Sequence, residues 1–171
     1  MSELRTNRIV PRDGLPAGAA GGIVQVKHAS QSSTVTSTSH TSYTDVLECA
    51  LTPVRNGNKI LVLGNVNGYS NDVSGADWTN AAYIKLDMKE NSGSYSRIAQ
   101  FEHPGIKIDS EICIVTPIHY MSGSLNAGTV YTYKICVKNT GSGDTWSWGR
   151  STDGCSVAEN GCRLTLMEVS G

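Results

Sequence analysis

Histidines are the side chains in this sequence best suited to general acid–base chemistry. The chain has four, His28, His40, His103 and His119. A serine or cysteine nucleophile needs a base and an orienting group within hydrogen-bond reach, and these histidines are scattered along the chain. The sequence also lacks GxSxG, HExxH, a Walker loop and a GxGxxG that joins a strand to a helix. We therefore expect each histidine to lie on a strand surface or in a loop.

Paired carboxylates could act on a glycoside. The candidates are Asp72, Asp77, Asp87, Glu90, Asp109 and Glu111. Their spacing brings no two of them to the separation that an acid and a nucleophile require. The chain also lacks the repeat of the long β-helices that cleave polysaccharides, and its DVSGAD segment lacks the ordered ligand spacing of a calcium loop. The sequence predicts no enzyme.

The cysteines do not form a metal-binding pattern. They are Cys49, Cys113, Cys136, Cys155 and Cys162. No CxxC pair and no histidine at zinc-finger spacing accompanies them, so we expect neither a metal nor another cofactor. The first three lie in apolar runs, where a thiol acts as a small buried hydrophobe. Cys155 and Cys162 bracket a turn-like segment and could meet across a hairpin, although synthesis in a cytoplasm favours the reduced pair.

Aromatic residues next to polar ones could bind a sugar or another surface group, because sugars stack on Trp and Tyr rings. Two tryptophans alternate within DTWSWGR, which places both on one face of a short strand. Two further aromatic residues lie in a predicted connection between Asn67 and Asn80. The candidate receptor-contact residues are Tyr69, Trp78, Trp146, Trp148 and Arg150. Alternating tryptophans also fill cores and subunit interfaces, and we favour that interpretation of the pair.

Length and composition indicate one β-rich domain. The chain has 171 residues, 18 of them Gly, and only 17% are charged. A helical domain would be richer in Ala, Leu, Glu and Lys. The formal charge of −1 gives no field that would gather nucleic acid. Neither a signal peptide nor an apolar stretch of ~20 residues is present, so we expect no membrane insertion.

From Ile23 onward, short runs of β-branched and aromatic residues alternate with turn signals, a pattern typical of an antiparallel sandwich or barrel. The predicted strands are Ile23–His28, Tyr43–Thr52, Lys59–Val66, Ala82–Glu90, Tyr95–Phe101, Glu111–Met121, Thr129–Lys138, Thr145–Gly149 and Cys162–Val169. The segment from Ala29 to Ser42 is rich in hydroxyl groups and fits either an edge strand or a loop.

Three connections carry the Asn and Gly residues that supply positive φ in tight turns. They are Asn56-Gly57, Asn91-Ser92-Gly93 and Asn160-Gly161. We expect the strands on either side of each to be antiparallel neighbours.

The last strand places Leu164, Leu166 and Glu168 on one face and other apolar groups on the opposite face. The run from Val130 to Val137 is also apolar on both faces. Such strands fit a sheet covered by the core on one side and by a second subunit on the other.

Residues 1–22 lack strand or helix periodicity and contain closely spaced Pro and Gly residues, which regular elements do not tolerate. We read them as an arm and a Gly-rich joint, followed by one β domain over residues 23–171. The segment from Glu3 to Asp13, which contains Leu4, Ile9 and Val10, fits either an arm that lies extended across a partner's surface or a disordered tail.

The sequence resembles small tail-fibre or spike proteins of tailed phages, particularly marine phages that infect cyanobacteria. The resemblance begins with ELRTNRIVPRDG, a Gly-rich joint and GGIVQVKH. It continues through NGNKILVLGNV and the closing RLTLMEVSG, so it spans nearly the whole chain. In that family a short polar arm leads into a GGIVQV strand, and the last strand ends in an apolar run, a Glu and a small residue.

The resemblance implies an all-β virion protein, made in the host cytoplasm, with an antiparallel jelly-roll-like β-sandwich behind an extended amino-terminal arm. It also implies a homotrimer that contacts other virion proteins of the tail or capsid and a glycan or protein of the host surface. The matching attachment residues are Leu4, Arg5, Asn7, Arg8, Ile9 and Val10. Because many fibres carry a longer shaft, a capsid decoration or head-fibre role stays open, as does a lectin or accessory domain of a cell.

Overall fold

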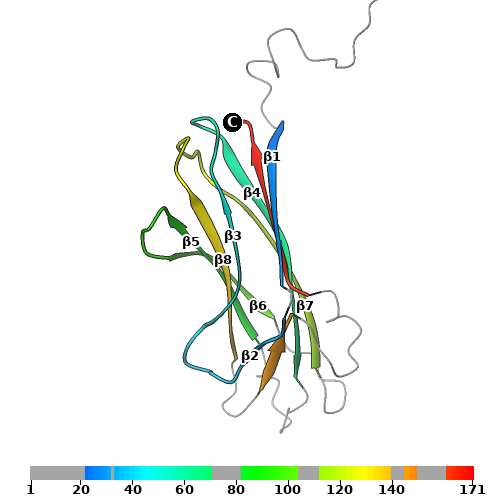
Figure 1. Ribbon diagram of the computed structural model, residues 1–171. Coiled ribbons are helices and arrows are strands. Elements are labelled where there is room, and N and C mark those ends of the chain that lie inside the picture. Colours follow the sequence, from blue (N-terminus) through cyan, green and yellow to red (C-terminus); the bar gives the residue numbers. More distant parts are fainter. Residues whose placement is uncertain (1–21, 32, 71–81, 104–111, 140–144, 150–160) are drawn as a thin grey trace, which may run out of the picture.

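A computed structural model describes residues 22–31, 33–70, 82–103, 112–139, 145–149 and 161–171. These residues form two facing antiparallel sheets and no helix (Figure 1). The strands are β1 (Ile23–Ser30), β2 (Val35–Ser37), β3 (Thr44–Leu51), β4 (Lys59–Ser70), β5 (Ala82–Glu90), β6 (Ser96–His103), β7 (Ile112–Met121), β8 (Tyr131–Asn139), β9 (Trp146–Trp148) and β10 (Arg163–Val169).

The strand order defines a jelly roll. The first sheet, called sheet A below, runs β1-β10-β4-β7. The short strand β9 pairs with β4 on the same edge as β10, farther along β4, and β2 pairs with β9. The second, sheet B, runs β3-β8-β5-β6. When the two three-residue strands are set aside, sheet A holds the first, eighth, third and sixth strands, and sheet B the second, seventh, fourth and fifth. This interleaving is the paired Greek-key arrangement of a jelly roll.

The core lies between the two sheets and follows from the alternation of apolar residues along each strand. In β10 the inward residues Leu164 and Leu166 are fully buried, and in β8 Tyr133 and Ile135 are too. Burying each such side chain contributes about 1.5–3 kcal/mol. The last strand, β10, lies inside its sheet, because it pairs with β1 on one side and β4 on the other.

All nine predicted strands are present, and the segment from Ala29 to Ser42 contributes the tenth, β2, which pairs with β9. The prediction that both faces of the strand are apolar holds for β10, whose outward Met167 and Val169 are half-buried. In β8 the outward face is mixed, because it carries the buried Cys136 together with Lys134 and Lys138.

Only one of the three turn predictions identified paired strands correctly. Asn91, with a φ of 48°, closes the hairpin between β5 and β6. Gly57 has the expected positive φ of 86°, but its connection leads from β3 in sheet B to β4 in sheet A. The strands around Gly161 are not paired with each other either, because β9 and β10 both pair with β4. Turn chemistry fixes local backbone geometry, whereas the partner of each strand is set by long-range packing.

The two ends of the described fold lie together. The N–H of Ser170 donates to the carbonyl of Gly22 at 2.9 Å, and the N–H of Gly22 donates to Oγ of Ser170 at 3.1 Å. The start of β1 and the carboxyl terminus therefore share one end of the sandwich (Figure 1). The predicted arm, residues 1–21, lies outside the described residues. In the part of the chain described, no helix is long and apolar enough to cross a bilayer.

Candidate interaction surfaces

The tryptophan pair belongs to the core. Trp146 and Trp148 extend from the same face of β9, as predicted, and their rings stack with centroids 5.3 Å apart and planes at 16°. Their side chains are 1% and 0% exposed. A receptor contact requires exposed rings, so that prediction is wrong for both, and the interpretation of the pair as core residues is confirmed.

Tyr69 is buried as well, at 4% exposure. It lies within β4 and not in a connection, because β7 pairs with β4 as far as Ser70. It therefore offers no exposed ring to a receptor. The remaining predicted contact residues, Trp78 and Arg150, lie outside the described residues. So do the predicted attachment residues Leu4, Arg5, Asn7, Arg8, Ile9 and Val10.

The described histidines lie on the surface, and the two described carboxylate candidates lie in a strand. His28, His40 and His119 are exposed on strands or in a loop, as predicted, and the side chain of His103 is outside the described part. Of the carboxylates weighed for glycoside chemistry, Asp87 and Glu90 are described, and both lie in β5. The residues described include no cluster of three or more His, Cys, Asp or Glu side chains that could hold a metal ion.

Glu168 forms a buried polar junction that the sequence did not reveal. It lies on the inward face of β10 and is 0% exposed. Its Oε1 accepts hydrogen bonds from the N–H of Val54 at 2.9 Å and from Nδ2 of Asn58 at 2.6 Å. Its Oε2 accepts one at 2.6 Å from Nε2 of Gln25, which also donates to the carbonyl of Thr52 at 2.7 Å. The carboxylate thus fastens the connection between β3 and β4 to β1 and β10.

The described cysteines are buried free thiols: Cys49, Cys136 and Cys162. Burial raises the pKa of Cys49 and that of Cys136, where the nearby carboxylates of Asp45 and Asp87 raise it further. Burial also raises the pKa of Cys162 from 9.0 to about 11. Because the thiolate is the reactive form of cysteine, burial and a raised pKa both lower the reactivity of these three thiols.

We expect these three thiols to resist iodoacetamide at pH 8 in the folded protein and to react fully after denaturation. Peptide mass spectrometry would locate the modified residues. Rapid labelling of Cys136 in the native protein would contradict the burial described above.

The free energy of unfolding should also depend on pH. Above pH 9 Cys162 ionises in the unfolded chain before it does in the folded chain, so stability should fall as the pH rises from 9.0 to about 11.

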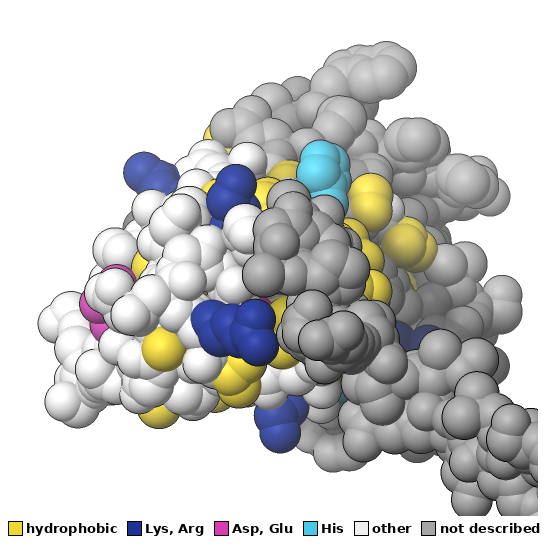
Figure 2. All heavy atoms as spheres, turned by 90° about the horizontal axis from the view of Figure 1, so that it is seen from above, with side chains coloured by type: hydrophobic (Ala, Val, Ile, Leu, Met, Phe, Trp, Pro, Cys, Tyr) yellow, Lys and Arg dark blue, Asp and Glu magenta, His cyan; other side chains and the backbone are white. Residues whose placement is uncertain are grey.

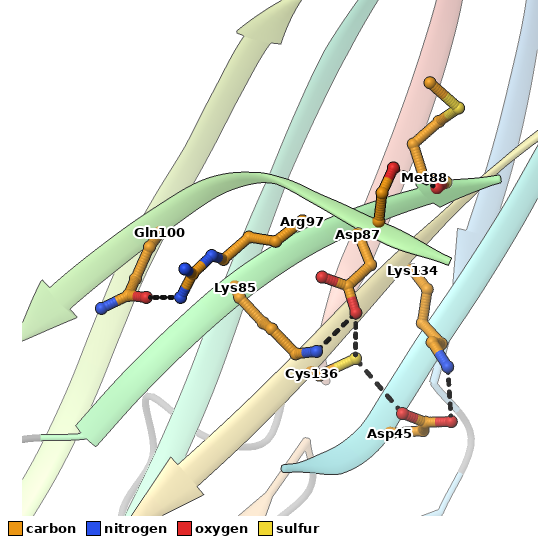
Figure 3. Close-up of polar contacts among 9 residues, drawn as sticks. Asp45, Lys85, Asp87, Met88, Arg97, Gln100, Lys134 and Cys136 are labelled. Carbon is orange, nitrogen blue, oxygen red and sulfur yellow. Dashed lines mark hydrogen bonds and ion pairs between the residues drawn. The ribbon is translucent and has the colours of Figure 1, made fainter. Parts of the chain in front are cut away.

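The outer face of sheet B carries a network of paired charges (Figure 3). Nζ of Lys134 lies 2.8 Å from Oδ2 of Asp45, and Nζ of Lys85 lies 2.6 Å from Oδ2 of Asp87. Between the pairs, Sγ of Cys136 donates to Oδ1 of Asp45 at 3.2 Å. Burial alone would raise the pKa of Asp45, but the hydrogen bonds from Lys134 and Cys136 outweigh it and lower the pKa. The ionised form of Asp45 is thus favoured.

Cross-strand register extends this pattern across sheet B. One row runs Glu48, Lys134, Asp87 and Arg97 on the four successive strands, so charges of opposite sign alternate. Neighbouring pairs of opposite charge stabilise a sheet, by about 0.2–1 kcal/mol each.

Tyrosine rings fill the spaces between the lysines of this face. Nζ of Lys134 lies 3.9 Å from the centroid of Tyr95 and Nζ of Lys85 lies 4.5 Å from that of Tyr43. These cation–π contacts hold the lysine ammonium groups against neighbouring tyrosine rings. The outer face of sheet B is therefore polar, largely neutralised within itself, and suited to contact with water.

The outer face of sheet A has the opposite character, since large apolar side chains on it are exposed. They are Ile23, Val26, Leu63, Val115 and Met121, with exposures from 37% to 57%. Surface hydrophobic residues are also visible from the end of the sandwich, where a group of them lies beside a histidine (Figure 2). A contiguous apolar face on a folded subunit usually marks an interaction site.

Comparison with known proteins finds no protein-family match and no similar curated protein. Similar solved structures include the Eiger TNF of S. frugiperda, with 10% identity, 88% of this chain and 89% of that chain covered, and a TM-score of 0.36. A structure of the infectious bursal disease virus Gx strain is 10% identical, with 85% of this chain and 36% of that chain covered and a TM-score of 0.42. The CBM22-1 xylan-binding domain of Paenibacillus barcinonensis Xyn10C is 10% identical, with 89% of this chain and 97% of that chain covered and a TM-score of 0.35. At these values the likenesses carry no argument about function, and the jelly-roll assignment rests on the strand order.

Proposed function

We propose that this chain is a structural protein of a phage virion, a tail-fibre or spike component with no catalytic activity. It assembles as a homotrimer, attaches to the particle through its amino-terminal arm, and presents the sandwich to the host surface. The observation that carries this proposal is the contrast between the two outer faces: paired charges on sheet B and uncovered apolar side chains on sheet A. The resemblance of the sequence to small tail-fibre proteins supports the virion setting.

The chemistry of the described side chains agrees with such a role. Its buried thiols are protonated near neutral pH, and its most buried carboxylate, Glu168, accepts three hydrogen bonds that join segments of the fold. These groups stabilise the sandwich. A binding surface formed by residues outside the described part, such as Trp78 and Arg150, stays part of the proposal.

A capsid decoration protein is the second candidate, since the same sandwich could clamp capsid subunits. The exposed apolar face of sheet A would serve either role. A decoration protein predicts many regularly spaced copies on the capsid and particles that become fragile to heat or low salt when it is missing. Copy number per particle separates the two candidates.

Replacing the apolar residues of the arm tests how the chain attaches. We expect the triple variant Leu4→Asp, Ile9→Asp and Val10→Asp to fold normally but to be lost from purified particles, because charged side chains cannot stay in an apolar contact. A matched control, Val130→Asp, changes an exposed valine of the sandwich and should be incorporated like the unchanged protein. Quantitative mass spectrometry of particles measures incorporation. Normal incorporation of the triple variant would overturn attachment through the arm.

A further inference from the structure

Two side-chain rows without an Asp, Glu, Lys or Arg cross four strands at the centre of the outer face of sheet A. Register places Val26 of β1 beside Met167 of β10, and Met167 in turn beside Leu61 of β4, which pairs with Met121 of β7. Residues paired across strands point to the same side of a sheet. The four side chains therefore form one continuous apolar row.

The adjacent row is uncharged as well when its histidines are neutral. It runs His28, Thr165, Leu63 and His119 across the same four strands, and Nδ1 of His28 lies 3.0 Å from Oγ1 of Thr165. The next pairs on either side of these rows contain Lys59 and Arg163. A face with an apolar centre and a charged rim has the composition of a protein–protein interface.

We propose that the outer face of sheet A, with these two rows at its centre, is where copies of the chain meet one another. This inference rests on the proposed oligomeric role and names its contact surface. Four strands about 4.8 Å apart and about 8 residues long cover a flat area on the order of 500 Å², and side-chain relief increases the accessible area toward the roughly 800 Å² per partner of stable interfaces. Sheet B is a poorer candidate, because charged side chains lie at the centre of its outer face, where Lys85 pairs with Asp87 and Lys134 with Asp45.

The position of the amino terminus favours a second copy over an unrelated partner. The 21 residues that precede Gly22 join the fold at β1, the edge strand of this same sheet. In a threefold assembly about an axis along the sandwich, copies that meet on sheet A have Gly22, where the amino-terminal segment joins the fold, at one common end. Arms that start side by side can attach jointly, and joint attachment strengthens binding without any new contact.

Sedimentation of full-length variants tests the contact surface. The unchanged protein should sediment at three times the 18.2 kDa of the chain. The double variant Val26→Lys and Leu63→Lys changes residues that are 51% and 37% exposed in the subunit, so the fold should survive. Two charges buried in the interface should weaken association at least about 100-fold and release monomers. Val130→Lys, at an exposed valine outside both rows, should leave the oligomer unchanged.

Methionine oxidation by peroxide gives a second readout of the same surface. Met121 and Met167 should be oxidised slowly in the unchanged protein and faster in the double variant, while Met88 of sheet B should react equally in both. An oligomer that persists in the double variant, or an unchanged protein that is monomeric, overturns the inference. Neither outcome decides the virion role, which incorporation into particles measures separately.

Discussion

Replacing Glu168 by Ala should lower the free energy of unfolding by about 3–5 kcal/mol. The substitution removes the acceptor of three hydrogen bonds and leaves a cavity in a fully buried position. The side chain of Asn58, which is itself buried, would then hold a donor without a partner, and each such group costs about 1–3 kcal/mol. Chemical denaturation followed by circular dichroism measures the change.

Glu168→Gln is the matched control, because it keeps the shape and one acceptor oxygen. That oxygen can still accept from Val54 and Asn58, but the new amide N–H₂ would face Nε2 of Gln25, also a donor. Gln25 cannot simply turn over, since its Nε2 donates to Thr52 as well. We therefore expect an intermediate loss of about 1–2 kcal/mol. Equal stability of the Ala variant and the unchanged protein would show that the junction is not a structural fastening.

Trp148→Ala should destabilise the fold by a similar amount, about 3–5 kcal/mol. The ring is 0% exposed, and its removal leaves Trp146 without its stacking partner. For a domain of this size such a loss lowers the melting temperature by roughly 10 °C. Differential scanning calorimetry measures the shift. Val130→Ala, at an exposed position, should change the stability by less than about 0.5 kcal/mol.

A second variant probes the same contact from the opposite strand. A Cβ added at Gly68 would lie 2.5 Å from the ring of Trp148, closer than real carbon atoms approach. Gly68→Ala should therefore displace the indole and cost about 1–3 kcal/mol. If both variants melt like the unchanged protein, the buried tryptophan stack does not hold sheet A together at this end.

The strands were predictable because each carries its own local signal. The alternation of Tyr131, Tyr133 and Ile135, for example, marks the inward face of β8 whatever its partners are. Strand partners were not predictable in the same way. Asn56-Gly57 has hairpin chemistry, yet the chain crosses there from one sheet to the other, since the pairing of β3 with β8 and of β4 with β10 and β7 depends on residues far away in sequence.

The candidate site was less accessible to sequence reasoning than the fold. The spacing of Leu164, Leu166 and Glu168 indicated a carboxylate on a buried face, but its donors come from positions more than 100 residues away. The apolar row of sheet A and the uncharged row beside it are likewise assembled from four strands, and each strand contributes only one residue to each row. Trp146 and Trp148 show the converse: their spacing predicted a shared face, and burial then decided that this face is the core.

The most direct test of the central claim is a cryo-electron microscopy map of intact virus particles that contain the chain, compared with particles made without its gene. The account predicts that density for a trimer of jelly-roll sandwiches disappears from the tail, and that sheet A of each copy faces its neighbours. Loss of many regularly spaced copies from the capsid would contradict the tail role and support decoration. Identical particles with and without the gene would contradict a virion role altogether.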